Sequence, residues 1–77
     1  MSSTIALRKC LQMLSFLEMS AIVSCESGDV VIDVTQDGNF IVNDKHFKNT
    51  DQIIGYLGVI TRIMTLNHET DEETIVF

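Results

Sequence analysis

Two runs of alternating apolar and polar residues, joined by a turn, occupy the middle of the chain. Positions 29–43 read Asp-Val-Val-Ile-Asp-Val-Thr-Gln-Asp-Gly-Asn-Phe-Ile-Val-Asn, a pattern that predicts two strands. A three-residue loop over 36–38 is favoured, because Gly38 can adopt the left-handed conformation that such a loop needs. It sets Val34 opposite Phe40, Ile32 opposite Val42 and Val30 opposite Asp44. The predicted core face consists of Val30, Ile32, Val34, Phe40 and Val42.

The same alternation begins earlier, over 21–25, and predicts a third strand that precedes a turn at Ser27-Gly28. With that turn, the pairs are Cys25 with Val30, Val23 with Ile32 and Ala21 with Val34. Cys25, Val23 and Ala21 thus lie on the core face already assigned, so two independently chosen turns agree on one face. The sequence therefore predicts a three-stranded antiparallel meander.

Helical spacing of apolar residues predicts a helix before the meander, with Ser2 or Ser3 as its cap. Its apolar positions are Leu7, Cys10, Leu11, Leu14, Phe16 and Leu17, and its polar side is Arg8, Gln12 and Ser15. Met13 and Met19 widen the apolar arc, which indicates burial on two sides.

A second helix is predicted after the connecting segment 44–48. Asn49 is its expected cap, with Gln52 reaching back in a capping box. Its apolar face is predicted to be Ile53, Tyr56, Leu57, Ile60, Ile63 and Met64. Gly55 and Gly58 would allow close approach to a neighbouring element, and Asn67 is the expected end of the helix.

The predicted fold is α+β in the order α-β-β-β-α, with both helices packed on one face of the three-stranded antiparallel meander. Residues 1–67 are expected to form one compact domain and residues 68–77 an acidic C-terminal tail. The composition of the tail favours disorder. Its closing Thr-Ile-Val-Phe permits the alternative that the tail adds a strand to a sheet edge.

The charge balance restricts the class of partner. The 77 residues include five Lys and Arg against eleven Asp and Glu, a formal net charge of −6. Such a chain repels phosphate backbones and anionic lipid headgroups, so we expect no direct binding of nucleic acid and none of membranes. A core this small makes self-association, most simply as a dimer, a reasonable expectation.

The apolar N-terminal third gives no indication of a membrane span. Arg8, Lys9, Gln12 and Glu18 interrupt it, and the start does not resemble a signal peptide. Cys10 and Cys25 fit neither a disulfide framework nor a CxxC site, which favours free thiols in a reducing compartment. We therefore expect a cytoplasmic protein.

No catalytic constellation is visible in the sequence. HExxH, Walker, GxSxG and GxGxxG motifs are all missing. Both cysteines fall on predicted core faces, where a thiol stays protonated, and Cys25 with His46 lacks the spacing of metal ligands. Asp29 and Asp33 are predicted to be exposed, and the sequence indicates no pocket around them that would suit them to acid–base catalysis. We therefore predict no enzyme activity, no cofactor and no metal.

The face opposite the core is mostly polar and acidic, interrupted by Ile22, Val31 and Ile41. Ordinary solvation of a small acidic protein would give such a pattern; a partner-binding surface would give it too. The candidate binding residues, on this face, on its turns and in the tail, are Glu26, Asp29, Val31, Asp33, Asp37, Ile41, Asp44, Asp71, Glu72 and Glu73.

These observations predict a non-enzymatic binding protein, a regulator or inhibitor that engages a protein partner with a basic surface and competes there with nucleic acid. In size and charge alone, without any motif, the chain resembles inhibitors of the phage or mobile-element type. The alternative is a structural homo-oligomer assembled through the outer sheet face or the N-terminal helix. An enzyme that uses His46 is the least favoured reading.

Overall fold

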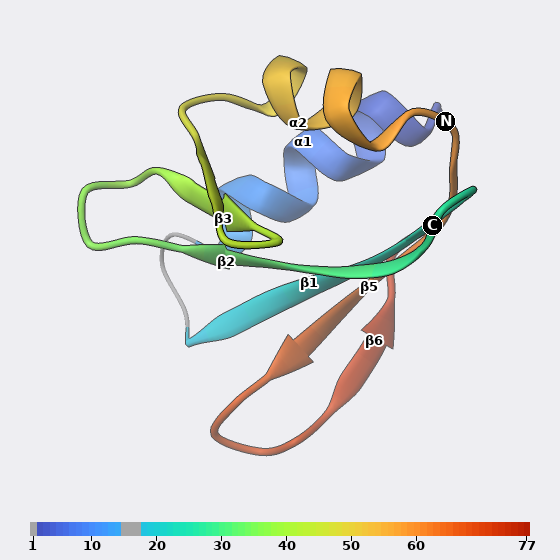
Figure 1. Ribbon diagram of the computed structural model, residues 1–77. Helices are drawn as coiled ribbons and strands as arrows, with labels where there is room; N and C mark the ends of the chain where they lie inside the picture. Colours follow the sequence, from blue (N-terminus) through green and yellow to red (C-terminus); the bar gives the residue numbers. More distant parts are fainter. Residues whose placement is uncertain (1, 15–17) are drawn as a thin grey trace.

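The computed structural model describes residues 2–14 and 18–77 and shows an α+β fold with its helices on one side of a twisted sheet (Figure 1). In this part of the chain, two helices and six strands follow the order α-β-β-β-β-α-β-β. They are α1 (Ser3–Leu14), β1 (Met19–Cys25), β2 (Gly28–Val34), β3 (Phe40–Val42), β4 (Lys45–Phe47), α2 (Thr50–Leu57), β5 (Ile60–Asn67) and β6 (Glu73–Ile75).

The sheet corrects the prediction of three strands. Its strands are all antiparallel and lie in the order β4-β3-β2-β1-β5-β6, so the predicted meander forms the interior and further strands extend it at both edges. β4 arises from the segment predicted to be a connection, and β5 and β6 arise from residues predicted to be helix and tail. The α+β class and the placement of both helices on one face are as predicted (Figure 1).

The central hairpin has the predicted register. Val34 pairs with Phe40 and Ile32 with Val42, and Gly38 has φ of +83° at the end of the three-residue loop. Val30 does not pair with Asp44, which corrects one predicted contact. Instead the chain reverses at Asn43 and Asp44, with φ of +51° and +65°, the two-residue hairpin turn whose twist matches the strands.

The β1–β2 hairpin differs from its predicted register by two residues. Cys25 closes it opposite Gly28, so that Glu26 and Ser27 form the turn and Val23 pairs with Val30. Because side chains on a strand alternate with a period of two, a shift of two leaves every side chain on its predicted face. Ala21, Val23, Cys25, Val30, Ile32 and Val42 are accordingly buried, and Val34 and Phe40 are partly buried against them.

Helix α1 supplies the other half of the core. Ser2 caps it, with its Oγ accepting the Ile5 N–H at 3.3 Å, and Leu7, Cys10, Leu11 and Leu14 are buried as predicted. Met13 is exposed and Met19 begins β1, so neither widens the helical face. The predicted apolar positions Phe16 and Leu17, and Ser15 on the predicted polar side, lie outside the described residues.

Helix α2 begins as predicted but ends ten residues before Asn67. Asn49 Oδ1 accepts the Gln52 N–H at 3.0 Å, and Gln52 Oε1 accepts the Lys48 N–H at 3.0 Å. Gly58, with φ of +76°, ends the helix and donates its N–H to Ile54 O. The expected close approach at the glycines is wrong, because a Cβ at Gly55 or Gly58 would meet no heavy atom within 4 Å.

Residues 68–77 were expected to be an acidic tail, for which the composition favoured disorder. In the structure this segment contains strand β6. Asn67 Oδ1 accepts the N–H groups of Glu69 and Thr70, which turns the chain back toward β5. Val76 then donates its backbone N–H to Ile63 O at 2.8 Å, the Ile63 N–H is donated to Phe77 O at 3.2 Å, and Val76 packs against the core. The alternative that these residues add a strand to a sheet edge is therefore the one that the structure shows.

In residues 2–14 and 18–77, neither helix has the length and apolar character needed to cross a membrane.

Candidate functional site

The face of the sheet that points away from the helices is the surface on which a partner was predicted to bind, and we call it the open face. No described helix or strand covers it (Figure 1). The ladder and the alternation of side chains fix its members. They are Ser20, Ile22 and Ser24 on β1; Asp29, Val31 and Asp33 on β2; Ile41 on β3; His46 on β4; Arg62, Met64 and Leu66 on β5; and Glu73 and Ile75 on β6.

Four apolar residues form a row across the open face, at right angles to the strands. Ile22 stands opposite Val31 on one side and opposite Met64 on the other, and Met64 stands opposite Ile75. Val31 is 49% exposed and Ile75 68%, whereas Met64 is only 9% exposed. Directly opposed side chains lie close enough to touch, so this apolar row is continuous across four strands. The row is exposed mainly at its two ends, Val31 and Ile75, and exposed apolar side chains that adjoin one another mark a candidate interaction site.

Three of the predicted acidic residues flank the apolar row. Asp29 and Asp33 lie on either side of Val31 along β2, and Glu73 lies two positions before Ile75 on β6. Ser24 Oγ donates to Asp29 Oδ1 at 2.7 Å, and Ser20 Oγ, also on β1, donates to Asp33 Oδ1. These bonds hold both β2 carboxylates over the sheet. Ile41, also predicted, lies on the open face opposite Asp33 and is half-buried.

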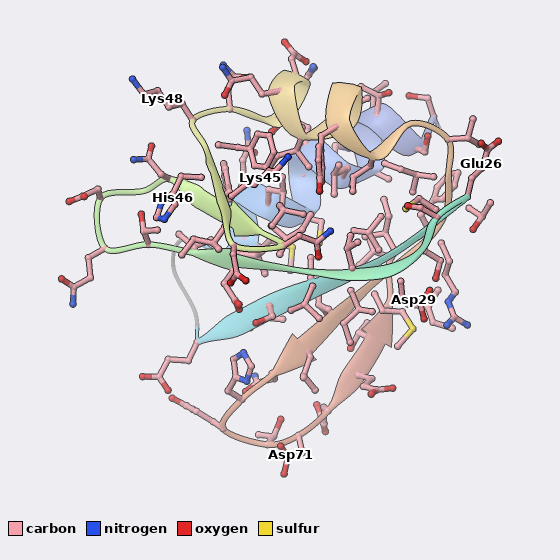
Figure 2. The ribbon with its side chains drawn as sticks, in the orientation of Figure 1. Glu26, Asp29, Lys45, His46, Lys48 and Asp71 are labelled. Carbon is pink, nitrogen blue, oxygen red and sulfur yellow. The ribbon has the colours of Figure 1, made fainter. Side chains whose placement is uncertain are left out.

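The remaining predicted acidic residues lie in turns and do not gather at one place. They are Glu26 between β1 and β2, Asp37 between β2 and β3, Asp44 between β3 and β4, and Asp71 and Glu72 between β5 and β6. Figure 2 shows Glu26 and Asp71 at distant ends of the molecule. The turn of Asp44 is directed toward α2, because Asn43 Nδ2 donates to the Tyr56 hydroxyl at 3.4 Å.

Met64, Leu66 and Arg62 were missed as open-face residues because the sequence predicts a helix across them. A signal for a strand was present in the run Val59, Ile60, Thr61, Ile63 and Thr65, whose β-branched residues follow directly after Gly58. With Met64 moved from helix to strand, Ile22 and Val31, two of the three apolar exceptions noted in the sequence, become part of the apolar row.

A buried serine links three separate segments at one end of the open face. Ser20 is completely buried; its Oγ donates to Asp33 Oδ1 and lies 2.6 Å from His68 Nε2. His68 also donates its backbone N–H to Glu18 O at 2.9 Å. The loop that follows β5 is thereby tied to β1 and β2.

Serine, histidine and aspartate are the residues of hydrolase triads, but their order here is different. In a triad the histidine lies between the other two and removes the serine proton. Here Ser20 lies between His68 and Asp33, and its single proton goes to the carboxylate, so the His68 Nε2–H must be the donor to Ser20 Oγ. Such a serine is not activated, and its burial keeps it from a substrate. The arrangement supports a structural role.

A cleft of about 470 Å³ opens beside this cluster, between the end of α1 and the ends of β1 and β2. Its lining consists of Leu14, Glu18, Met19, Asp33, Val34, Thr35, Gln36 and His68. The lining combines the acidic Glu18 and Asp33 with apolar residues and with the polar Thr35, Gln36 and His68.

Both cysteines are buried, as the sequence predicts. Burial raises the pKa of the Cys10 thiol to about 11, so it remains protonated at neutral pH. Cys25 Sγ donates to Gly28 O at 3.2 Å inside the β1–β2 hairpin. Within the described ranges, no three His, Cys, Asp or Glu side chains are grouped in a way that would hold a metal ion.

The fold and the open face define a small α+β protein in which helices cover one side of the sheet and an acid-flanked apolar row marks the other. Comparisons with protein-family models, with curated proteins and with solved structures found no match. Its function is therefore argued from its own residues.

Proposed function

We propose that this chain is a small acidic, non-enzymatic binding protein, a regulator or inhibitor that engages a protein partner with a basic surface. The observation that carries the proposal is the apolar row with carboxylates beside it on β2 and β6. Apolar contact provides affinity, while carboxylates around it speed encounter and select a basic partner. Where that partner's basic surface also binds phosphates, the protein competes with nucleic acid.

The distribution of charge supports this choice of surface. Of the five Lys and Arg residues, all within the described ranges, only Arg62 lies on the open face. Arg8 and Lys9 lie on α1, and Arg8 pairs with Asp51 of α2 at 3.1 Å. Lys45 Nζ lies 4.9 Å from the centre of the Tyr56 ring on α2, and Figure 2 shows Lys45 and Lys48 on the helix side of the sheet. A basic partner is therefore attracted to the open face and away from the helices.

The edges of the sheet are less suited to binding than its face. β4 and β6, the two edge strands, have three residues each, and short edge strands offer few free backbone groups to an added strand. The open face, in contrast, extends over all six strands. The two free, buried cysteines are consistent with a cytoplasmic location, which we include in the proposal.

A homo-oligomer is the second candidate, favoured by the exposure of Val31 and Ile75. Packing two open faces together would bring Asp29, Asp33 and Glu73 against the same carboxylates of the other copy. Juxtaposed like charges disfavour such a dimer, and they do so most at low salt. A partner with basic residues does not meet this obstacle, so it is preferred.

The test is capture of a partner from a host lysate at low and at high salt. Val31→Asp places a charge in the apolar row, and Met13→Asp makes the same type of change on α1; the two residues are similarly exposed, at 49% and 47%. The wild type and Met13→Asp should retain a common partner that Val31→Asp loses, and high salt should reduce retention.

Retention of the same partner by Val31→Asp, or retention of none by the wild type at either salt, would contradict the proposal. Loss of the partner by Met13→Asp alone would point to the N-terminal helix. Light scattering on all three proteins separates the second candidate, which requires a dimer in the wild type that Val31→Asp dissociates.

A further inference from the structure

We infer that the element bound on the open face is a basic amphipathic helix of the partner, lying along β1 and β5. This inference rests on the proposed function and goes further by specifying the shape and charge pattern of the bound segment. It follows from the width of the apolar row, from the positions of the carboxylates, and from the way in which α1 packs on the other side of the same strands.

The apolar row has the width of a helix. It extends over the four strands β2, β1, β5 and β6, and three spacings between neighbouring strands amount to about 14 Å. A helix with its side chains is about 10–12 Å across. A helix lying along β1 and β5 would cross the row at Ile22 and Met64, while Val31 and Ile75, the more exposed pair, would contact its two sides.

The carboxylates lie where the polar sides of such a helix would be. Asp29 and Asp33 are on β2 along one side, and Glu73 is on β6 along the other. The two aspartates are four positions apart, about 13 Å along a strand. Basic residues seven or eight positions apart on a helix are about 11–12 Å apart, and the long side chains of Lys and Arg span the difference. The partner helix should therefore carry basic residues on both sides of its apolar stripe.

The inner side of the sheet already accepts a helix on the same two strands. Helix α1 packs mainly against β1 and β5, and Figure 1 shows it on the side of the sheet away from the open face. A partner helix on the open face would form a third layer and bury the second face of the sheet. An added strand would have only a three-residue edge to pair with, and a second copy would oppose like charges.

The probes are three synthetic peptides, each of about 15 residues, a length of about 22 Å when helical. The first has Leu at helical spacing with Lys on both sides; the second has the same composition in an order that destroys the stripe; the third keeps the stripe and replaces Lys by Glu. Each is titrated into the wild type, Val31→Asp and Met13→Asp, and binding is followed by fluorescence anisotropy and by amide chemical shifts.

The first peptide should bind the wild type at least about tenfold more tightly than either of the others. Val31→Asp should weaken that binding by about tenfold or more, whereas Met13→Asp should leave it within about twofold. Amide shifts should be concentrated in β1, β2, β5 and β6. Equal binding of the first two peptides, or shifts confined to β4 or β6, would overturn the helical occupant.

The peptide and lysate experiments can fail separately. If Val31→Asp abolishes capture from lysate while no helical peptide binds, the open face is a binding surface for a different element and only the present inference is wrong. If the variant leaves capture unchanged, the proposed function itself is wrong.

Discussion

If α2 ends at Leu57, as in the structure, alanine at Gly55 and alanine at Gly58 should change the stability of the protein in opposite directions. Gly55 lies within the helix, and Gly58 follows its last residue, Leu57, with φ of +76° and ψ of −136°. A Cβ at either position meets no heavy atom within 4 Å, so packing does not distinguish them. The difference in stability between Gly55→Ala and Gly58→Ala therefore reports the backbone alone.

The magnitudes follow from the two conformations. Gly55→Ala should stabilise the fold by about 0.5–1 kcal/mol, because alanine loses less conformational entropy in a helix. Gly58→Ala should destabilise it by about 1–3 kcal/mol, because L-residues rarely adopt that region. In a chain of this size, a change of 1 kcal/mol shifts Tm by about 4–8 °C. Thermal and urea denaturation followed by circular dichroism will measure both shifts.

A mirror-image residue provides the control. The angles at Gly58 are the mirror image of −76° and +136°, close to extended polyproline geometry, so D-alanine at position 58 should be tolerated in a chemically synthesised chain. If the helix instead continued to Asn67, as helical spacing alone predicts, both L-alanine variants would stabilise the protein. A rise in Tm for Gly58→Ala would therefore refute the boundary between α2 and β5.

Three further predictions concern the core and the open face. Ser20→Ala removes two hydrogen bonds from a buried hydroxyl and should destabilise the fold by about 1–2 kcal/mol, more than Ser24→Ala, in urea denaturation. Ile32→Ala, at a fully buried position, should cost about 2–5 kcal/mol, and its neighbour Val31→Ala less than about 1 kcal/mol; the reverse ranking would invert the two faces of the sheet. The pKa of Cys10 rises from 9.0 to about 11 on folding, so the unfolded thiol ionises first. The stability that folding gains from keeping the Cys10 thiol protonated is complete below about pH 9 and declines as the pH rises toward about 11. This decline should be missing from the urea midpoints of Cys10→Ala.

The parts of the fold that local chemistry determines were predictable from the sequence. Gly38 fixed the loop length of the central hairpin, and Asn49 with Gln52 fixed the start of α2. The core face of the meander followed from alternation, and the error of two residues at Cys25 and Gly28 did not disturb it. In each case a few neighbouring residues contain the whole physical cause.

The end of α2 was mispredicted because a bulge imitates helical spacing. Cys25 pairs with Ile60, whereas the preceding Ser24 pairs with Arg62, so Thr61 is an extra residue in β5. Ile60 and Ile63 consequently both face the core although they are three positions apart. A regular strand would have sent them to opposite faces. Spacing alone cannot separate such a strand from a helix, and the β-branched residues after Gly58 were the better guide.

The open face could be only half predicted, because a surface on a sheet is assembled by pairing between distant segments. Ile22 and Val31 belong to the predicted meander, but Met64 and Ile75 join them only when β5 pairs with β1 and β6 with β5. An apolar residue that appears isolated in the sequence, such as Ile75 at the end of an acidic run, thus becomes part of a continuous row. The same pairing places Glu73 across the sheet from the carboxylates of β2. Strand order therefore decides whether such residues are scattered over the surface or form one continuous row. Strand order here depends on β5, the strand whose alternation is interrupted by the bulge at Thr61.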